Sequence, residues 1–242
     1  MKNRITNKNN IKFVCGIGVF SALAIIVAFA TNWIKVGFLS FDAKDAVITL
    51  AAFIYGPLSG VLIAAVAAIV EFLTFSGTGV YGLIMNFASS ATIALVSSLI
   101  YSRKKTFKFA IFGIYSGVVS VTLVMLLLNI LVTPHYMGVD VGDVVALLPT
   151  LLLPFNLAKA LFNGGAVLLM YKPVIRAMRK ANIAPALRKK SAPVNSAPAD
   201  NTVVKSGHST HNTSLAVMLG LITVAVAVLA LVLLQIFKPW IG

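Results

Sequence analysis

The sequence predicts an all-α integral membrane protein. Of its 242 residues, 59% are hydrophobic and only 11% are charged, and the mean hydropathy is +0.97. A soluble domain would be about 45–50% apolar. Apolar runs also recur along the chain at lengths near the ~20 residues that a helix needs to cross the hydrocarbon core.

Seven hydrophobic segments are predicted to form the membrane-crossing helices. They run roughly Phe13–Thr31, Ala46–Tyr55, Leu58–Phe75, Val80–Tyr101, Phe109–Val132, Leu147–Tyr171 and Ser214–Phe237. The second segment is short, so it either begins before Ala46 or crosses only part of the bilayer. Gly56-Pro57 separates it from the third, which predicts a tight hairpin because proline ends a helix at the residue before it.

The basic residues predict the orientation in the membrane. Sixteen of the 20 Lys and Arg residues lie before the first segment, between the fourth and fifth, or after the sixth. The positive-inside rule makes this side the cytoplasm, with the N-terminus inside and the C-terminus outside. This placement also argues against binding of nucleic acid, despite the net charge of +14. The first segment also has features of a signal peptide, although a polytopic protein needs no cleavage to begin insertion.

A change of composition divides the chain into three parts. Residues 181–213 are rich in Pro, Ala, Ser, Asn and Lys, which predicts a flexible cytoplasmic linker. The linker follows a membrane domain at residues 1–180 and precedes an extra transmembrane helix at residues 214–238. His208 and His211 lie in the linker, but two histidines without further ligands do not make a metal site, and no metal is predicted.

The sixth segment carries the most informative polar residues. Asn156, Lys159 and Asn163 are spaced i, i+3 and i+7, so a helix places them on one face. A charge within a bilayer costs about 2.5–3.5 kcal/mol even on the mild insertion scale. We therefore expect this face to line a ligand cavity, which Asn129 of the fifth segment would share. The alternative is a structural polar cluster that holds the helices together.

Further candidate residues lie towards the outer side. The loop between the first two segments mixes apolar and polar residues as a lid would, which makes Leu39, Ser40 and Phe41 substrate-binding candidates. Asp45 is a candidate as well, or an N-cap of the second helix. Asn86 in the fourth segment is either a ligand contact or an interhelical hydrogen bond.

The polar groups indicate the chemistry of the ligand. Asparagine offers donor and acceptor together and lysine offers donors only, which matches a neutral ring carrying carbonyls and an imide N–H. A phosphate would more often draw arginine or a nest of backbone amides. Aromatic residues of the outer half could stack on a flat ligand. These are Phe38, Phe41, Phe75, Tyr81 and Phe87.

Other function classes find little support. The sequence has no P-loop motif, no H-E-x-x-H and no G-x-S-x-G, and no nucleophile–base pair is recognisable, so an enzyme is not expected. An ion-coupled carrier needs a buried acid, and Glu71 is the one candidate within a segment. Glu71 either reaches the interface or lines the cavity mouth, and Asp42 in the outer loop is expected to be solvated.

Four stretches resemble the S components of energy-coupling factor (ECF) vitamin transporters, most closely the riboflavin-specific ones. They are Phe38-Leu-Ser-Phe-Asp-Ala-Lys-Asp45, Phe53-Ile-Tyr-Gly-Pro-Leu-Ser-Gly60, Gly77-Thr-Gly-Val-Tyr-Gly-Leu-Ile-Met-Asn-Phe87, and Leu152-Leu-Pro-Phe-Asn-Leu-Ala-Lys159 with Leu169-Met-Tyr-Lys-Pro173. The resemblance covers about residues 10–180. It implies a six-helix transmembrane bundle, to which this chain adds the C-terminal helix.

The resemblance also implies partners and roles. The ligand would be riboflavin, taken up across the prokaryotic plasma membrane, with folate or thiamin as alternatives. Asn156, Lys159 and Asn129 would contact the flavin, and the first outer loop would help to close the site. Ala24 and Ala28, a small-xxx-small pair, would meet the membrane-embedded T component, which joins two cytoplasmic ATPases. No cofactor is implied.

Overall fold

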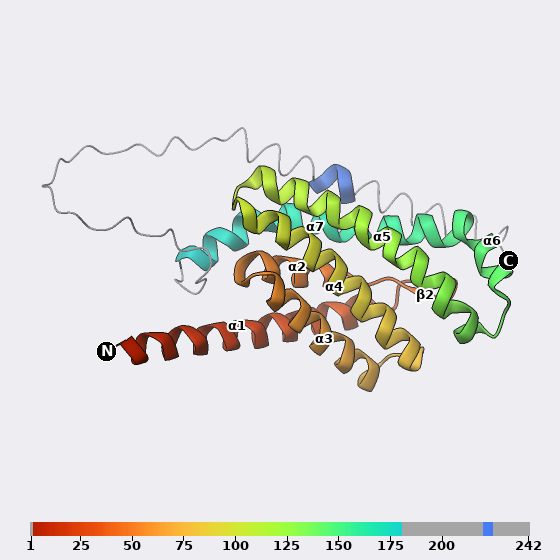
Figure 1. Cartoon of the computed structure of the whole chain (residues 1–242), viewed down its shortest axis with the longest axis horizontal. Coiled ribbons are helices and arrows are strands. Elements are labelled where there is room, and N and C mark those ends of the chain that lie inside the picture. Colours follow the sequence, from red (N-terminus) through yellow and green to blue (C-terminus); the bar gives the residue numbers. More distant parts are fainter. Residues whose placement is uncertain (1, 181–219, 225–242) are drawn as a thin grey trace, which may run out of the picture.

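The computed structural model describes residues 2–180 and 220–224, which form a bundle of long helices (Figure 1). The predicted linker at 181–213 and most of the predicted helix at 214–238 lie outside the described residues. The elements are α1 (Lys2–Thr31), β1 (Lys35–Val36), β2 (Leu39–Ser40), α2 (Lys44–Tyr55), α3 (Pro57–Thr74), α4 (Gly79–Arg103), α5 (Phe107–Met137), α6 (Val141–Leu147), the π-helical turn η1 (Leu148–Leu152) and α7 (Leu153–Lys180).

Five stretches of the described chain are long and apolar enough to cross a membrane. They are Ile11–Thr31, Pro57–Thr74, Gly79–Arg103, Phe107–Met137 and Val141–Met178. The last begins before the predicted sixth segment and contains η1. Pro149 lies in this turn and Pro154 is the second residue of α7, and neither can donate a backbone hydrogen bond to the preceding turn. The protein is thus a multi-helix membrane protein, while the predicted count of six helices plus one stays a prediction.

The second predicted segment is a helix, but it is too short to span the bilayer. The twelve residues of α2 extend about 18 Å at 1.5 Å per residue, against a hydrocarbon core of about 30 Å. All twelve are buried, and α1, α3, α4 and α7 pack around them. Helix α2 is therefore the central core element of the bundle.

The predicted hairpin between α2 and α3 is present. Gly56 has φ of 106°, a backbone conformation that glycine adopts without a steric penalty. Pro57 occupies the first position of α3, where its missing N–H costs nothing. The chain therefore reverses direction within one residue.

A small β-hairpin covers one end of the bundle. Strands β1 and β2 pair antiparallel, with Val36 opposite Leu39. Val36 and Phe41 are buried against Leu151 and Phe155, which lie in η1 and at the start of α7. The hairpin was not predicted, because two-residue strands leave no alternating pattern long enough to recognise.

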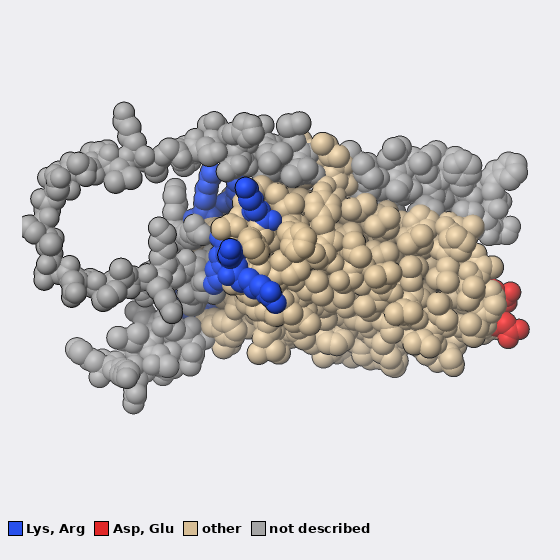
Figure 2. Space-filling model, turned by 45° about the horizontal axis from the view of Figure 1, so that its top comes forward, with Lys and Arg blue, Asp and Glu red and all other residues tan. Residues whose placement is uncertain are grey.

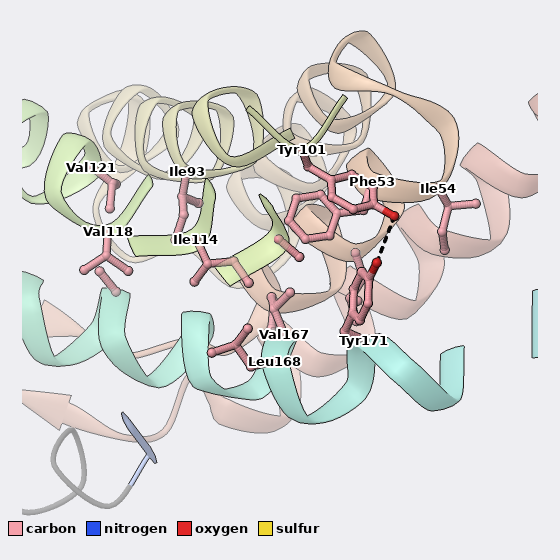
Figure 3. Close-up of a cluster of buried hydrophobic side chains, with 14 of the residues drawn as sticks. Phe53, Ile54, Ile93, Tyr101, Ile114, Val118, Val121, Val167, Leu168 and Tyr171 are labelled. Atoms are coloured by element: carbon pink, nitrogen blue, oxygen red, sulfur yellow. Dashed lines mark hydrogen bonds between the residues drawn. The ribbon is translucent and has the colours of Figure 1, made fainter. Parts of the chain in front are cut away.

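The aromatic core fixes α2 to α4 and α7. The ring of Phe53 stacks on Tyr101 with centroids 4.4 Å apart, and the hydroxyls of Tyr101 and Tyr171 lie 3.0 Å apart (Figure 3). Aliphatic side chains from α4, α5 and α7 complete the cluster. They include Ile93, Ile114, Val118, Val167 and Leu168.

Ala24 and Ala28, which the resemblance assigns to the contact with a T component, pack inside this chain, and that contact stays a prediction. Both residues are 0% exposed, and Ala24 packs in a cluster with Ala64 and Ala67 of α3. Small side chains let two helices approach closely, and here the neighbouring helix belongs to the same chain. Gly18 and Ala22, which lie one helical turn apart, are exposed small residues of α1.

A helical turn at residues 220–224 lies on the surface of the bundle, against α5 and α7 (Figure 1). The hydroxyls of Tyr115 in α5 and Thr223 lie 3.1 Å apart. Gly165 of α7 contacts the turn so closely that an added Cβ would come within 3.0 Å of the Gly220 carbonyl. This part of the predicted C-terminal helix thus packs on α5 and α7.

Candidate substrate-binding site

A cavity of about 330 Å³ lies at the end of the bundle that carries the β-hairpin. Its walls come from the α1–α2 loop, the end of α3, the starts of α4 and α7, and α5. Ligand pockets in proteins typically have about 300–1,000 Å³. The charged and amide side chains of the wall are Asn32, Lys35, Asp42, Glu71, Asn86, Asn129, Asn156 and Lys159.

The structure brings together the three residues that the sequence singled out most strongly. Asn129 of α5 lines the same cavity as Asn156 and Lys159 of α7. Asn129 donates to the Met125 carbonyl at 2.6 Å, and Asn156 donates to the Leu152 carbonyl at 2.7 Å. Each amide has two N–H donors and an acceptor oxygen, so each retains hydrogen-bonding capacity for a ligand.

Leu39, Ser40 and Asn86 also line the cavity. Their places agree with the proposed role of the outer loop and the start of α4, while contact with a substrate stays a prediction. Five aromatic side chains share the wall. These are Phe38, Phe75, Tyr81, Tyr136 and Phe155.

Asn163 is a predicted site residue that lies outside the cavity wall. It is 0% exposed, and its Oδ1 accepts a hydrogen bond from the Ala46 N–H at 2.9 Å. Its Nδ2 donates to the carbonyls of Asp42 and Lys159, each at 3.0 Å. Asn163 therefore ties the start of α2 to α7, which is a structural role.

Asp45 and Phe41 also lie outside the wall. The Asp45 carboxylate accepts hydrogen bonds from the hydroxyls of Ser89 and Ser90 in α4. It is not the N-cap of α2, because that position belongs to Ala43. The ring of Phe41 packs edge-on against Phe162, with centroids 5.1 Å apart. Asp45 and Phe41 thus contact α4 and α7, and neither lines the cavity.

The sequence did not reveal a buried ion network beside the cavity. The Lys159 ammonium lies 2.7 Å from Asp42 Oδ2, and Lys44 Nζ lies 2.7 Å from both carboxylate oxygens of Glu71. Lys44 Nζ is also 3.5 Å from Asp42 Oδ2. All four residues are buried, so the expectation that Asp42 is solvated was wrong.

The network sets the charge state of Asp42. Burial alone would raise the pKa of this carboxyl, but the neighbouring ammonium groups of Lys159 and Lys44 outweigh it and hold the pKa at about 2. Asp42 is therefore a carboxylate at neutral pH. Lys159 has the anionic partner that no residue of its own helix could supply.

The model of the family "ECF transporter, substrate-specific component" matches residues 12–175, which include the whole cavity wall. The chain belongs to this family. Membership of this family implies partnership with a T component and ATPases in a membrane, and it implies a role in transport.

The chain is also similar to one known transporter and to one solved structure. The riboflavin transporter RibU of Staphylococcus aureus (strain TCH60) is 26% identical over 185 residues, which cover 73% of this chain and 97% of the relative. The solved structure of the S component of a bacterial ECF transporter superposes with a TM-score of 0.59 at 27% identity. That match covers 72% of this chain and 99% of the solved chain.

Proposed function

We propose that this S component binds riboflavin from the outer side of the membrane for uptake by an ECF transporter. The observation that carries the proposal is the cavity wall. It combines the amides of Asn129 and Asn156, the Lys159 ammonium and several aromatic rings in about 330 Å³.

The chemistry of this wall suits a flavin. The isoalloxazine ring is flat and neutral, with carbonyl oxygens that accept from an ammonium or an amide N–H and an imide N–H that donates to an amide oxygen. Phe38, Phe75 and Tyr81 are available to stack on its faces. The similarity to a riboflavin transporter at 26% identity supports the same substrate.

The distribution of charge supports entry from outside. On the face shown in Figure 2, Lys and Arg side chains gather at one end of the described molecule and acidic side chains at the other. The exposed Arg103, Lys104 and Lys105 lie at the end of α4 away from the cavity. The positive-inside rule assigns a basic end to the cytoplasm, and this supports a position of the cavity and the β-hairpin at the outer face.

Titration of the purified protein with riboflavin tests the proposal, because stacking and burial of the flavin quench its fluorescence. We expect saturable quenching at one site per chain, and a yellow preparation when cells grow with riboflavin. Lys159→Ala and Asn156→Ala should each weaken binding by about 1–3 kcal/mol, whereas Lys108→Ala at the exposed basic end should not. Absence of quenching, or tighter binding of folate or thiamin in competition, would contradict riboflavin as the substrate.

A further inference from the structure

Asp42 holds Lys159 by an asymmetric contact. Oδ2 of Asp42 lies 2.7 Å from the Lys159 ammonium and 3.5 Å from that of Lys44. Oδ1 is buried without a hydrogen-bond partner among the described residues. Both cations therefore contact one oxygen, and Asp42 is the anion that separates two ammonium groups.

The backbone around Asp42 is fixed independently of this ion pair. Its carbonyl accepts from Asn163 Nδ2 at 3.0 Å, and the next residue, Ala43, donates its N–H to Thr31 Oγ1 at 3.1 Å. Helix α7 thus holds Asp42 at two points one turn apart, Asn163 at the carbonyl and Lys159 at the carboxylate. The carboxylate is a preorganised partner for the ammonium.

The neighbouring Lys44 ammonium is held by a different carboxylate. That lysine directs its ammonium to both oxygens of Glu71, and it is 1% exposed. Without the carboxylate of Asp42, the Lys159 ammonium would lose the anion that it contacts directly, while the Lys44 ammonium would remain nearby. Like charges repel, so Lys159 would leave its place in the cavity wall.

We infer that Asp42 is a positioning residue for substrate binding, which holds the Lys159 ammonium in the orientation that meets the ligand. An ammonium has three N–H donors, and the contact with Asp42 uses one of them, which leaves donors for a ligand carbonyl. The inference rests on the proposed function, since Lys159 must be a riboflavin contact for its orientation to matter.

A double-mutant cycle measures this dependence. Riboflavin affinity is determined for the wild type, Asp42→Asn, Lys159→Met and the combined variant, each checked for a folded, monodisperse preparation. If Asp42 acts through Lys159, D42N weakens binding about tenfold or more in the wild-type background. It has almost no further effect when Lys159 is already methionine. Asp42→Glu, which keeps the charge, restores part of the affinity.

A purely structural role for Asp42 gives a different pattern. The losses of affinity from D42N and K159M then multiply in the combined variant, and D42E rescues no affinity. Either result overturns the inference, while the proposed function stands because the wild type still binds riboflavin. If D42N alone does not fold, K159M is compared with the combined variant, which removes both charges. Equal affinities support the inference, and a further large loss overturns it.

The exposed Asp143 of α6 provides the matched control, because Asp143→Asn removes the same charge from a residue outside the ion network and the cavity wall, and this variant should bind riboflavin as the wild type does. Failure of the wild type to bind riboflavin overturns the proposed function, and the positioning role falls with it. Normal wild-type binding with unchanged D42N affinity overturns the positioning role alone.

Discussion

The buried ion pair between Lys44 and Glu71 is predicted to contribute strongly to the stability of the fold. Lys44 lies at the start of α2 and Glu71 near the end of α3. They are 1% and 3% exposed, and both carboxylate oxygens lie 2.7 Å from the ammonium. Lys44→Met leaves Glu71 as a buried carboxylate without its cation, because the other buried ammonium, Lys159, is engaged by Asp42.

The size of the effect follows from this burial. Removing one partner of a buried ion pair costs about 3–5 kcal/mol, whereas replacing both partners by apolar side chains of similar volume is often neutral. We therefore expect Lys44→Met to lower the free energy of unfolding by about 3–5 kcal/mol. The combined variant with Glu71→Met should lose much less than the sum of the losses of the two single variants, so the double-mutant cycle should give a coupling energy clearly different from zero.

Equilibrium unfolding in mixed micelles, followed by far-ultraviolet circular dichroism, measures these free energies. Lys108→Met is the matched control, since this lysine is exposed at the start of α5 and its loss should change stability by less than about 0.5 kcal/mol. The reasoning is refuted if the two single losses add in the combined variant, or if Lys44→Met costs no more than Lys108→Met.

Three further predictions address the site and the C-terminal contact. Asn129→Leu, in the cavity wall, should weaken riboflavin binding by about 1–3 kcal/mol in the fluorescence titration. Asn163→Leu leaves the buried Ala46 N–H and Asp42 carbonyl without this partner, so it should destabilise folding by about 2–6 kcal/mol in the unfolding assay; a neutral effect would contradict its structural role. Gly165→Leu clashes with residues 220–224 and should lower the free energy of unfolding by about 1–3 kcal/mol in the same assay. Gly18→Leu, at a glycine with open space around it, should not lower it.

Much of the fold followed from local sequence. Hydropathy located the long helices because a membrane helix must be apolar over about 20 residues, and the described part of the chain contains five such stretches. Gly56-Pro57 predicted the α2–α3 reversal, since these two residues restrict the backbone by themselves. Helical spacing placed Asn156 and Lys159 on one face, and both line the cavity.

Pairing across the bundle could not be read from the sequence. Asp42 is 117 residues from Lys159, and Lys44 is 27 residues from Glu71; no local pattern records that these charges meet. The same limit explains Asn163, which shares the spacing of Asn156 and Lys159 but contacts backbone groups at the start of α2. Periodicity gives the face of a helix, and only packing decides what that face meets.

The sequence by itself determined that this chain is a helical membrane protein with a polar face on the helix after Pro154, because hydropathy and helical period depend on neighbouring residues alone. The tertiary structure decided that α2 is the buried centre, that Ala24 packs within its own chain, and that Asp42 is the partner of Lys159. These depend on which distant segments come together, and in a bundle that is decided by the packing of all its helices at once.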